Sequence, residues 1–96
     1  MRLRILKSFR DKLNDQVDYI ARDKPAAARR FKSDVIKRIK GIPRMPYANR
    51  KSIFFDREDI RDLVFKGYVI VYKIDDERKI IDVFGFTKYE NDPFMK

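Results

Sequence analysis

The chain has 96 residues, which is enough for one domain with one modest core, and we expect a single domain over residues 1–96. It contains no cysteine and no histidine. This composition excludes disulfides and thiol catalysis and removes the usual zinc ligands, so no metal and no cofactor are expected. No apolar run approaches the roughly 18 residues of a membrane span, and residues 1–6 are too charged for a secretory signal. We therefore expect a cytoplasmic protein without a membrane partner.

The basic excess lies in the N-terminal half of the chain. Overall, 24 Lys and Arg residues face 15 Asp and Glu residues, for a net charge of +9. Residues 1–50 hold 15 basic and 5 acidic residues, whereas residues 51–96 hold 9 and 10. Residues 29–51 carry nine basic residues and a single acid, Asp34. Such a block either attracts a polyanion or an acidic protein, or is an ordinary solvated surface.

The first elements are a strand and a helix. Residues 2–6 alternate polar and apolar side chains, which predicts a half-buried strand. Ser8 is expected to cap the helix that follows. The core-facing stripe of that helix consists of Phe9, Leu13, Val17 and Ile20. The segment 22–25 ends the helix, because proline is tolerated only in the first turn of the next one.

A second helix is predicted over residues 25–40. Its apolar stripe consists of Ala28, Phe31, Val35, Ile39 and Ile42. Gly41 and Pro43 end this helix. Arg38 falls near the middle of the stripe, so it is expected to reach solvent or to be paired.

The opposite face of the second helix carries a candidate binding surface. Arg29, Lys32 and Lys40 lie there, and Ile36 also projects away from the core stripe. One interpretation is a docking surface with Ile36 as its apolar anchor. The other is a solvated face with one exposed aliphatic residue, which is common in soluble proteins.

Three consecutive strands are predicted over residues 60–65, 68–74 and 80–86. Tyr68, Ile70, Tyr72 and Ile74 share one face, and Val69 and Val71 share the other. A tight turn at Lys66-Gly67 and a polar loop at 75–79 join the strands. Before them, residues 43–59 show no regular period, and residues 52–55 form either a short strand or an apolar plug.

These elements predict an α+β fold in the order β-α-α-(β)-β-β-β. The three consecutive strands form a small antiparallel sheet, and the N-terminal strand and the helical hairpin pack on it. The two helices must cover one sheet face to bury both apolar stripes, which leaves the other face exposed.

Two segments of the chain resemble one protein family. Residues 19–27 read YIARDKPAA with Phe31 one turn later, and residues 61–75 read RDLVFKGYVIVYKID. In this order and at this distance, they are similar to the RelE/ParE toxins of bacterial type II toxin–antitoxin systems. The resemblance covers nearly the whole chain. It implies growth inhibition, plasmid stabilization and a cognate antitoxin that is usually acidic where it wraps the toxin, with the helix pair and the exposed sheet face as docking surfaces.

The resemblance implies two possible targets. Some members cut mRNA in the ribosome, whereas others bind DNA gyrase and poison it without catalysis. RelE-like ribonucleases commonly carry arginine after the Gly-Tyr pair, where this chain has Val69. This departure favours gyrase inhibition, while the high basic charge favours the alternative of ribosome-dependent mRNA cleavage. A plain nucleic-acid-binding module is a third class, but no helix-turn-helix or RNA-recognition signature supports it.

A ribonuclease needs a base, a cationic phosphate clamp and an acid. The best candidates for clamping and base stacking are Arg61, Lys88 and Tyr89. Further candidates are Arg57 as a clamp and Glu58 or Glu90 as the base. In the alternative interpretation, the charged residues at 57–62 neutralise one another, and Lys88 and Tyr89 only end the last strand.

Overall fold

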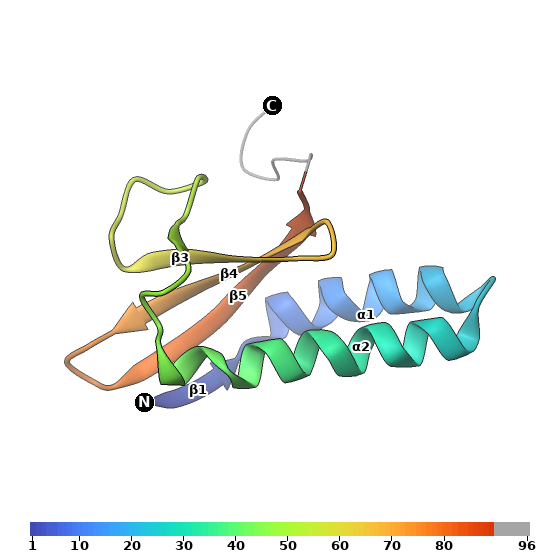
Figure 1. The fold of residues 1–96 in the computed structure, drawn as a ribbon, viewed down its shortest axis with the longest axis horizontal. Coiled ribbons are helices and arrows are strands. Elements are labelled where there is room, and N and C mark those ends of the chain that lie inside the picture. Colours follow the sequence, from blue (N-terminus) through green and yellow to red (C-terminus); the bar gives the residue numbers. More distant parts are fainter. Residues whose placement is uncertain (90–96) are drawn as a thin grey trace.

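A computed structural model describes residues 1–89 of the chain. They form β1 (Arg2–Ile5), α1 (Lys7–Ala21), α2 (Pro25–Lys40), a short 3-10 helix η1 (Ile42–Arg44), β2 (Arg50–Lys51), β3 (Ile60–Phe65), β4 (Tyr68–Asp75) and β5 (Ile80–Lys88). The strands lie in one sheet in the order β1-β5-β4-β3-β2, with α1 and α2 side by side along one face (Figure 1). The predicted α+β architecture is confirmed, and α2 has the predicted bounds.

The sheet is mixed rather than wholly antiparallel. β3, β4 and β5 form the predicted antiparallel meander. β1, however, pairs in parallel with β5, with Leu3 opposite Ile81 and Ile5 opposite Val83. The chain leaves β1 through the helical hairpin and reaches the opposite edge of the sheet before the meander returns to β1. Such a long crossover is what a parallel strand pair requires.

The connection between β1 and α1 contradicts one prediction. α1 begins at Lys7 with Leu6 as its N-cap residue, and no side chain caps it. Ser8 therefore lies in the first turn of the helix, because β1 passes into α1 without a loop. Its hydroxyl donates a hydrogen bond to the carbonyl of Phe84 over 2.9 Å. The predicted N-cap is wrong, and Ser8 ties α1 to β5 instead.

The core between the helices and the sheet contains the predicted stripes. Its buried members are Phe9, Leu13, Phe31, Val35, Ile39, Ile42, Leu63, Ile70, Tyr72, Ile74, Ile81, Val83 and Phe86. The ring of Tyr68 lies 5.1 Å from the rings of both Phe31 and Phe86, which joins α2 to β4 and β5. The guanidinium of Arg38 lies 5.0 Å from the ring of Phe65 at the surface, as predicted for a long cation within an apolar stripe.

The second sheet face is partly covered. Ile60, Val69 and Val71 are buried there, under Phe54, Phe55 and Phe84. Residues 52–55 thus act as the apolar plug, and the short strand β2 lies just before them. The expectation that this whole sheet face is exposed is wrong, because a meander with apolar residues on both faces needs cover on both sides.

Candidate functional site

The two cations considered as phosphate clamps lie at opposite ends of the meander. Arg61 pairs with Tyr72 in β4, whereas Lys88 at the end of β5 pairs with Tyr68 at the start of β4. Along β4 these partners are about 13 Å apart, since a strand rises roughly 3.3 Å per residue. Arg61 and Lys88 are also separated by the width of β4, which lies between β3 and β5. The structure does not bring these two side chains together.

Tyr89 faces away from both cations. Successive residues of a strand point to opposite faces of the sheet. Lys88 lies on the helix side, where it lines a hollow of about 470 Å³ with Lys12 and Tyr19 of α1. The hydroxyl of Tyr89 instead contacts Arg50, which pairs with Asp62 at the β2–β3 edge. The three candidates for a ribonuclease site therefore lie in three different surroundings.

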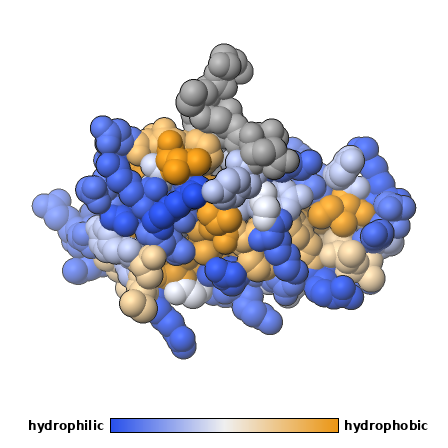
Figure 2. Space-filling view, turned by 45° about the horizontal axis from the view of Figure 1, so that its top comes forward, coloured by the Kyte–Doolittle hydropathy of each residue, from blue (hydrophilic) through white to orange (hydrophobic). Residues whose placement is uncertain are grey.

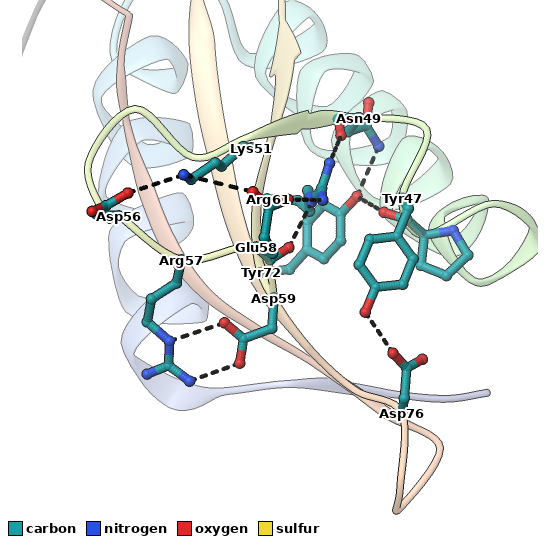
Figure 3. Close-up of polar contacts among 11 residues, drawn as sticks. Tyr47, Asn49, Lys51, Asp56, Arg57, Glu58, Asp59, Arg61, Tyr72 and Asp76 are labelled. Atoms are coloured by element: carbon teal, nitrogen blue, oxygen red, sulfur yellow. Dashed lines mark hydrogen bonds and ion pairs between the residues drawn. The ribbon is translucent and has the colours of Figure 1, made fainter.

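Neighbouring residues hold the side chain of Arg61 in place (Figure 3). Its guanidinium donates to the carbonyl and to the carboxylate of Glu58, over 2.9 and 3.1 Å. It also donates to the carbonyl of Asn49 over 3.2 Å and lies 4.9 Å from the ring of Tyr47. Only 14% of the side chain is exposed. Most of its donors are thus already used, and the guanidinium fixes the loop before β2 to the start of β3.

The other charges of β2 and of the connection between β2 and β3 are paired as well. Arg57 and Asp59 form two hydrogen bonds of 2.9 and 2.7 Å, which lower the pKa of the Asp59 carboxyl. Lys51 lies 2.9 Å from Asp56 and 3.7 Å from Glu58, and its hydrogen bond lowers the pKa of Asp56. These contacts agree with the interpretation that the charges at 57–62 neutralise one another. Glu90 lies outside the described residues.

A buried tyrosine holds the loop that precedes β2. Tyr72 is fully buried, and its hydroxyl donates to the carbonyl of Pro46 over 2.5 Å. The same hydroxyl accepts a hydrogen bond of 3.1 Å from the side-chain amide of Asn49 (Figure 3). Burial raises the pKa of the Tyr72 phenol, so it stays a neutral donor at physiological pH. Tyr72 therefore connects the core of the sheet to the loop that holds Arg61.

Sequence reasoning missed a second polar cluster, formed by Arg50, Asp62 and Tyr89. One carboxylate oxygen of the buried Asp62 accepts from Arg50, over 3.3 and 3.4 Å, and from the backbone N–H of Ile53 over 3.0 Å. Its other oxygen has no hydrogen-bond partner in the part of the chain that the structure describes. Arg50 also lies 3.3 Å from the Tyr89 hydroxyl, a contact that raises the pKa of the guanidinium.

One sequence signal could have revealed this cluster. Asp62 alternates with Ile60 and Val64 and so shares a sheet face with Val71. A carboxylate on an apolar face needs a cation or several donors, because burying an unpaired charge is costly. The pattern thus calls for a cation nearby, but the sequence does not say which of the many basic residues supplies it.

The residues of the candidate binding surface on α2 do come together. They line a shallow groove of about 490 Å³, the basic groove, whose lining residues are Arg29, Lys32, Ser33, Ile36, Lys37 and Lys40. The four cations are exposed. Ile36 is half-buried and also packs against the core, so the expectation that it simply projects away from the core is corrected. It lies close enough to the stripe to touch the core on one side and to line the groove on the other.

Two further observations concern metal ions and membranes. Within residues 1–89, no three His, Cys, Asp or Glu side chains lie close enough to hold a metal ion. In the same part of the chain, neither helix is long and apolar enough to cross a membrane.

Comparison with known protein families agrees with the fold and with the two sequence segments. The family model described as "ParE toxin of type II toxin-antitoxin system, parDE" matches residues 3–93, which is nearly the whole chain. A comparison with curated proteins gives no match. The match runs from Leu3 in β1 through the helical hairpin and all later strands of the sheet. The chain therefore belongs to the ParE toxin family of type II toxin–antitoxin systems.

Proposed function

We propose that this toxin arrests growth by binding DNA gyrase and that it cuts no RNA itself. A type II toxin–antitoxin toxin has a cognate antitoxin, so the neutralising partner follows from the family. The choice of gyrase rests on the match to ParE toxins and on one geometric observation. Arg61, Lys88 and Tyr89 do not converge, and the guanidinium of Arg61 is already held by Glu58 and Asn49.

The geometry matters because RNA cleavage through the 2′-hydroxyl needs several groups at one phosphate. A base, a cationic clamp and an acid must each reach a different oxygen of the same reacting centre. A guanidinium with most of its donors occupied cannot stabilise new charge on a phosphate without giving up its present contacts. Binding to a protein target makes no such demand on these side chains.

One observation favours ribosome-dependent mRNA cleavage as a second candidate. Arg50 and Tyr89 bring a cation and a phenol together, with the guanidinium 5.3 Å from the ring. Such a pair offers a phosphate contact and a surface on which a base can stack. The donors of Arg50 are also engaged, by Asp62 and Tyr89, but 34% of its side chain is exposed against 14% for Arg61. If the toxin is a nuclease, Arg50 and Tyr89 are therefore better candidates for its site than Arg61.

Two reactions with the purified toxin separate these functions. In the first, the toxin is incubated with gyrase and supercoiled plasmid, and gyrase-dependent linear DNA is measured. In the second, it is incubated with programmed ribosomes, and mRNA ends are mapped. We expect cleaved DNA only in the presence of gyrase, and intact mRNA. Intact DNA together with mRNA cleavage that is lost in Arg50→Ala and Tyr89→Ala would establish the nuclease instead.

A test in cells addresses the toxin assignment itself. Controlled expression in a bacterial host should arrest growth and induce the DNA damage response. Co-expression of the small open reading frame beside the toxin gene should restore growth, and so should a toxin-resistant gyrase. Harmless accumulation of folded protein in several hosts would contradict the proposal.

A further inference from the structure

Arg38 is a cation within the apolar stripe of α2 that the fold leaves without an acidic partner. Asp34 lies one helical turn before it, at the spacing of an ion pair within a helix, but Asp34 pairs with Lys66 over 3.4 Å. The guanidinium of Arg38 lies 5.0 Å from the ring of Phe65 instead. Within residues 1–89, its side chain forms no ion pair and no hydrogen bond. The ring therefore holds the guanidinium in place and leaves its N–H donors available.

Arg38 lies at a hollow that has no acidic wall. This hollow of about 320 Å³, the junction hollow, lies between the end of α2, η1, the loop before β2, and β3. Among the described residues that line it, Lys37, Arg38 and Arg44 are exposed cations, and none is an acid. A hollow with cations and no acid is a region of positive potential that attracts an anion. Two of these cations are guanidiniums, whose planar forks match the oxygens of a phosphate group.

The junction hollow also has an apolar wall and a free acceptor. Ile42 and Leu63 are buried lining residues, and Met45 lines it with 69% of the residue exposed. Such exposure is unusual on a surface where hydrophilic residues predominate and apolar ones form separate patches (Figure 2). The amide nitrogen of Asn49 donates to Tyr72 over 3.1 Å, but the carboxamide oxygen has no hydrogen-bond partner in the part of the chain that the structure describes. It is therefore available to a ligand.

We propose that the junction hollow binds a free nucleotide. Its phosphate lies on the three cations, and its base packs against Met45 and Leu63. The carboxamide oxygen of Asn49 accepts a hydrogen bond from an exocyclic amine of the base. A nucleotide fits because it combines an anionic group with a flat ring that is apolar on its faces and polar at its edge. This site is independent of the toxin's target and does not rest on the proposed function.

Two other occupants fit less well. An inorganic anion would satisfy the cations but would leave the apolar wall and the Asn49 oxygen unused. A nucleic-acid duplex would offer phosphates but would keep its bases stacked, so that their faces could not reach Met45 and Leu63. The combination of cations, an apolar wall and one acceptor in a hollow of this size favours a single nucleotide.

The first test uses the full chain with AMP as the probe, in calorimetric titrations. Adenosine, which lacks the phosphate, and ribose 5-phosphate, which lacks the base, are the matched controls. We expect AMP to bind and each control to bind at least about tenfold more weakly, because each loses one set of contacts. AMP at ten times its dissociation constant should also raise the melting temperature by about 5–10 °C, because it binds only the folded state.

The second test uses variants at exposed positions. Arg38→Gln should weaken AMP binding about 10- to 100-fold, and Arg44→Gln is a second variant with the same expected direction. Arg38→Lys should lie between the parent and Arg38→Gln, because it keeps the charge but loses the planar fork. Arg30→Gln is the control, since it removes one exposed cation of the same helix outside the hollow, and it should bind AMP within about twofold of the parent.

Several results would overturn the proposal. The absence of AMP binding by the folded parent would do so, as would equal losses in Arg38→Gln and Arg30→Gln. Binding of ribose 5-phosphate as tight as that of AMP would make the hollow a plain anion site. Tight binding of a single-stranded oligonucleotide that AMP does not displace would make it a contact for a nucleic-acid strand. Toxicity and antitoxin binding are separate measurements, so none of these results decides the proposed function.

Discussion

The hydroxyl of Tyr72 allows a quantitative test of how the loop at Arg61 is held. Tyr72→Phe removes one oxygen atom and keeps the buried ring. Two hydrogen bonds are lost, one to the carbonyl of Pro46 and one from the amide of Asn49. Each contributes about 0.5–1.5 kcal/mol, so the free energy of unfolding should fall by about 1–3 kcal/mol. For a domain of this size, the melting temperature should fall by about 5–20 °C.

The matched control is Tyr47→Phe, which removes the same atom from a more exposed ring. The Tyr47 hydroxyl donates to Asp76 over 2.6 Å, and 43% of the residue is exposed. Water can replace this bond, so the loss should stay below about 0.5 kcal/mol. Equilibrium urea unfolding at pH 7 measures both variants, with equal denaturant slopes as the sign that only stability changed.

Asn49 provides a further test of this hydrogen-bond network. If the Tyr72 hydroxyl and the Asn49 amide act together, Asn49→Ala in the Tyr72→Phe background should cost less than it does in the parent. Equal losses in Tyr72→Phe and Tyr47→Phe would refute the idea that the buried hydroxyl holds the loop. So would a loss below about 0.5 kcal/mol in Tyr72→Phe.

Three further changes test the core, an ion pair and the sheet. Phe31→Ala should cost about 3–5 kcal/mol and leave the domain mostly unfolded, so a melting temperature near that of the parent would contradict the helix packing. Arg4 donates hydrogen bonds of 2.7 and 3.0 Å to Asp82 and so lowers the pKa of that carboxyl. The pair therefore stabilises the fold at pH values above the unfolded carboxyl pKa of about 3.9. This stabilisation is lost as the pH falls through the lower pKa of the folded state. Asp82→Asn should therefore cost about 0.2–1 kcal/mol at pH 7, and this cost should shrink in thermal melts as the pH falls through the lowered folded pKa; a pH-independent difference would exclude this linkage. Gly85→Ala places a new Cβ 3.0 Å from the Cβ of Val71 and should cost about 1–3 kcal/mol, which an unchanged urea midpoint would disprove.

Local patterns in the chain predicted most of the fold. The 3.6-residue period of α2, together with Pro25 and Gly41, gave the correct bounds for that helix. The Lys66-Gly67 pair marked a tight turn, and both residues have positive φ values, 51° and 81°. These features depend on neighbours within a few residues, which is why the sequence alone determines them.

The candidate site residues were only partly predictable from local patterns. Helical spacing was enough to place Arg29, Lys32, Ile36 and Lys40 on one face of α2, while their role in binding stays a prediction. It could not show that Arg61 and Lys88 lie at opposite ends of the meander, since that follows from the strand register.

Only the tertiary structure decided how the edges and the buried charges are arranged. The sequence predicts the strands β1 and β5 but not their parallel pairing, because strand pairing depends on the path of the whole chain. Likewise, the sequence contains the carboxylate of Asp62, but only the folded chain brings Arg50 to it from twelve residues away. A buried charge needs a partner, and long-range packing rather than local sequence preference determines which segment lies close enough to supply it.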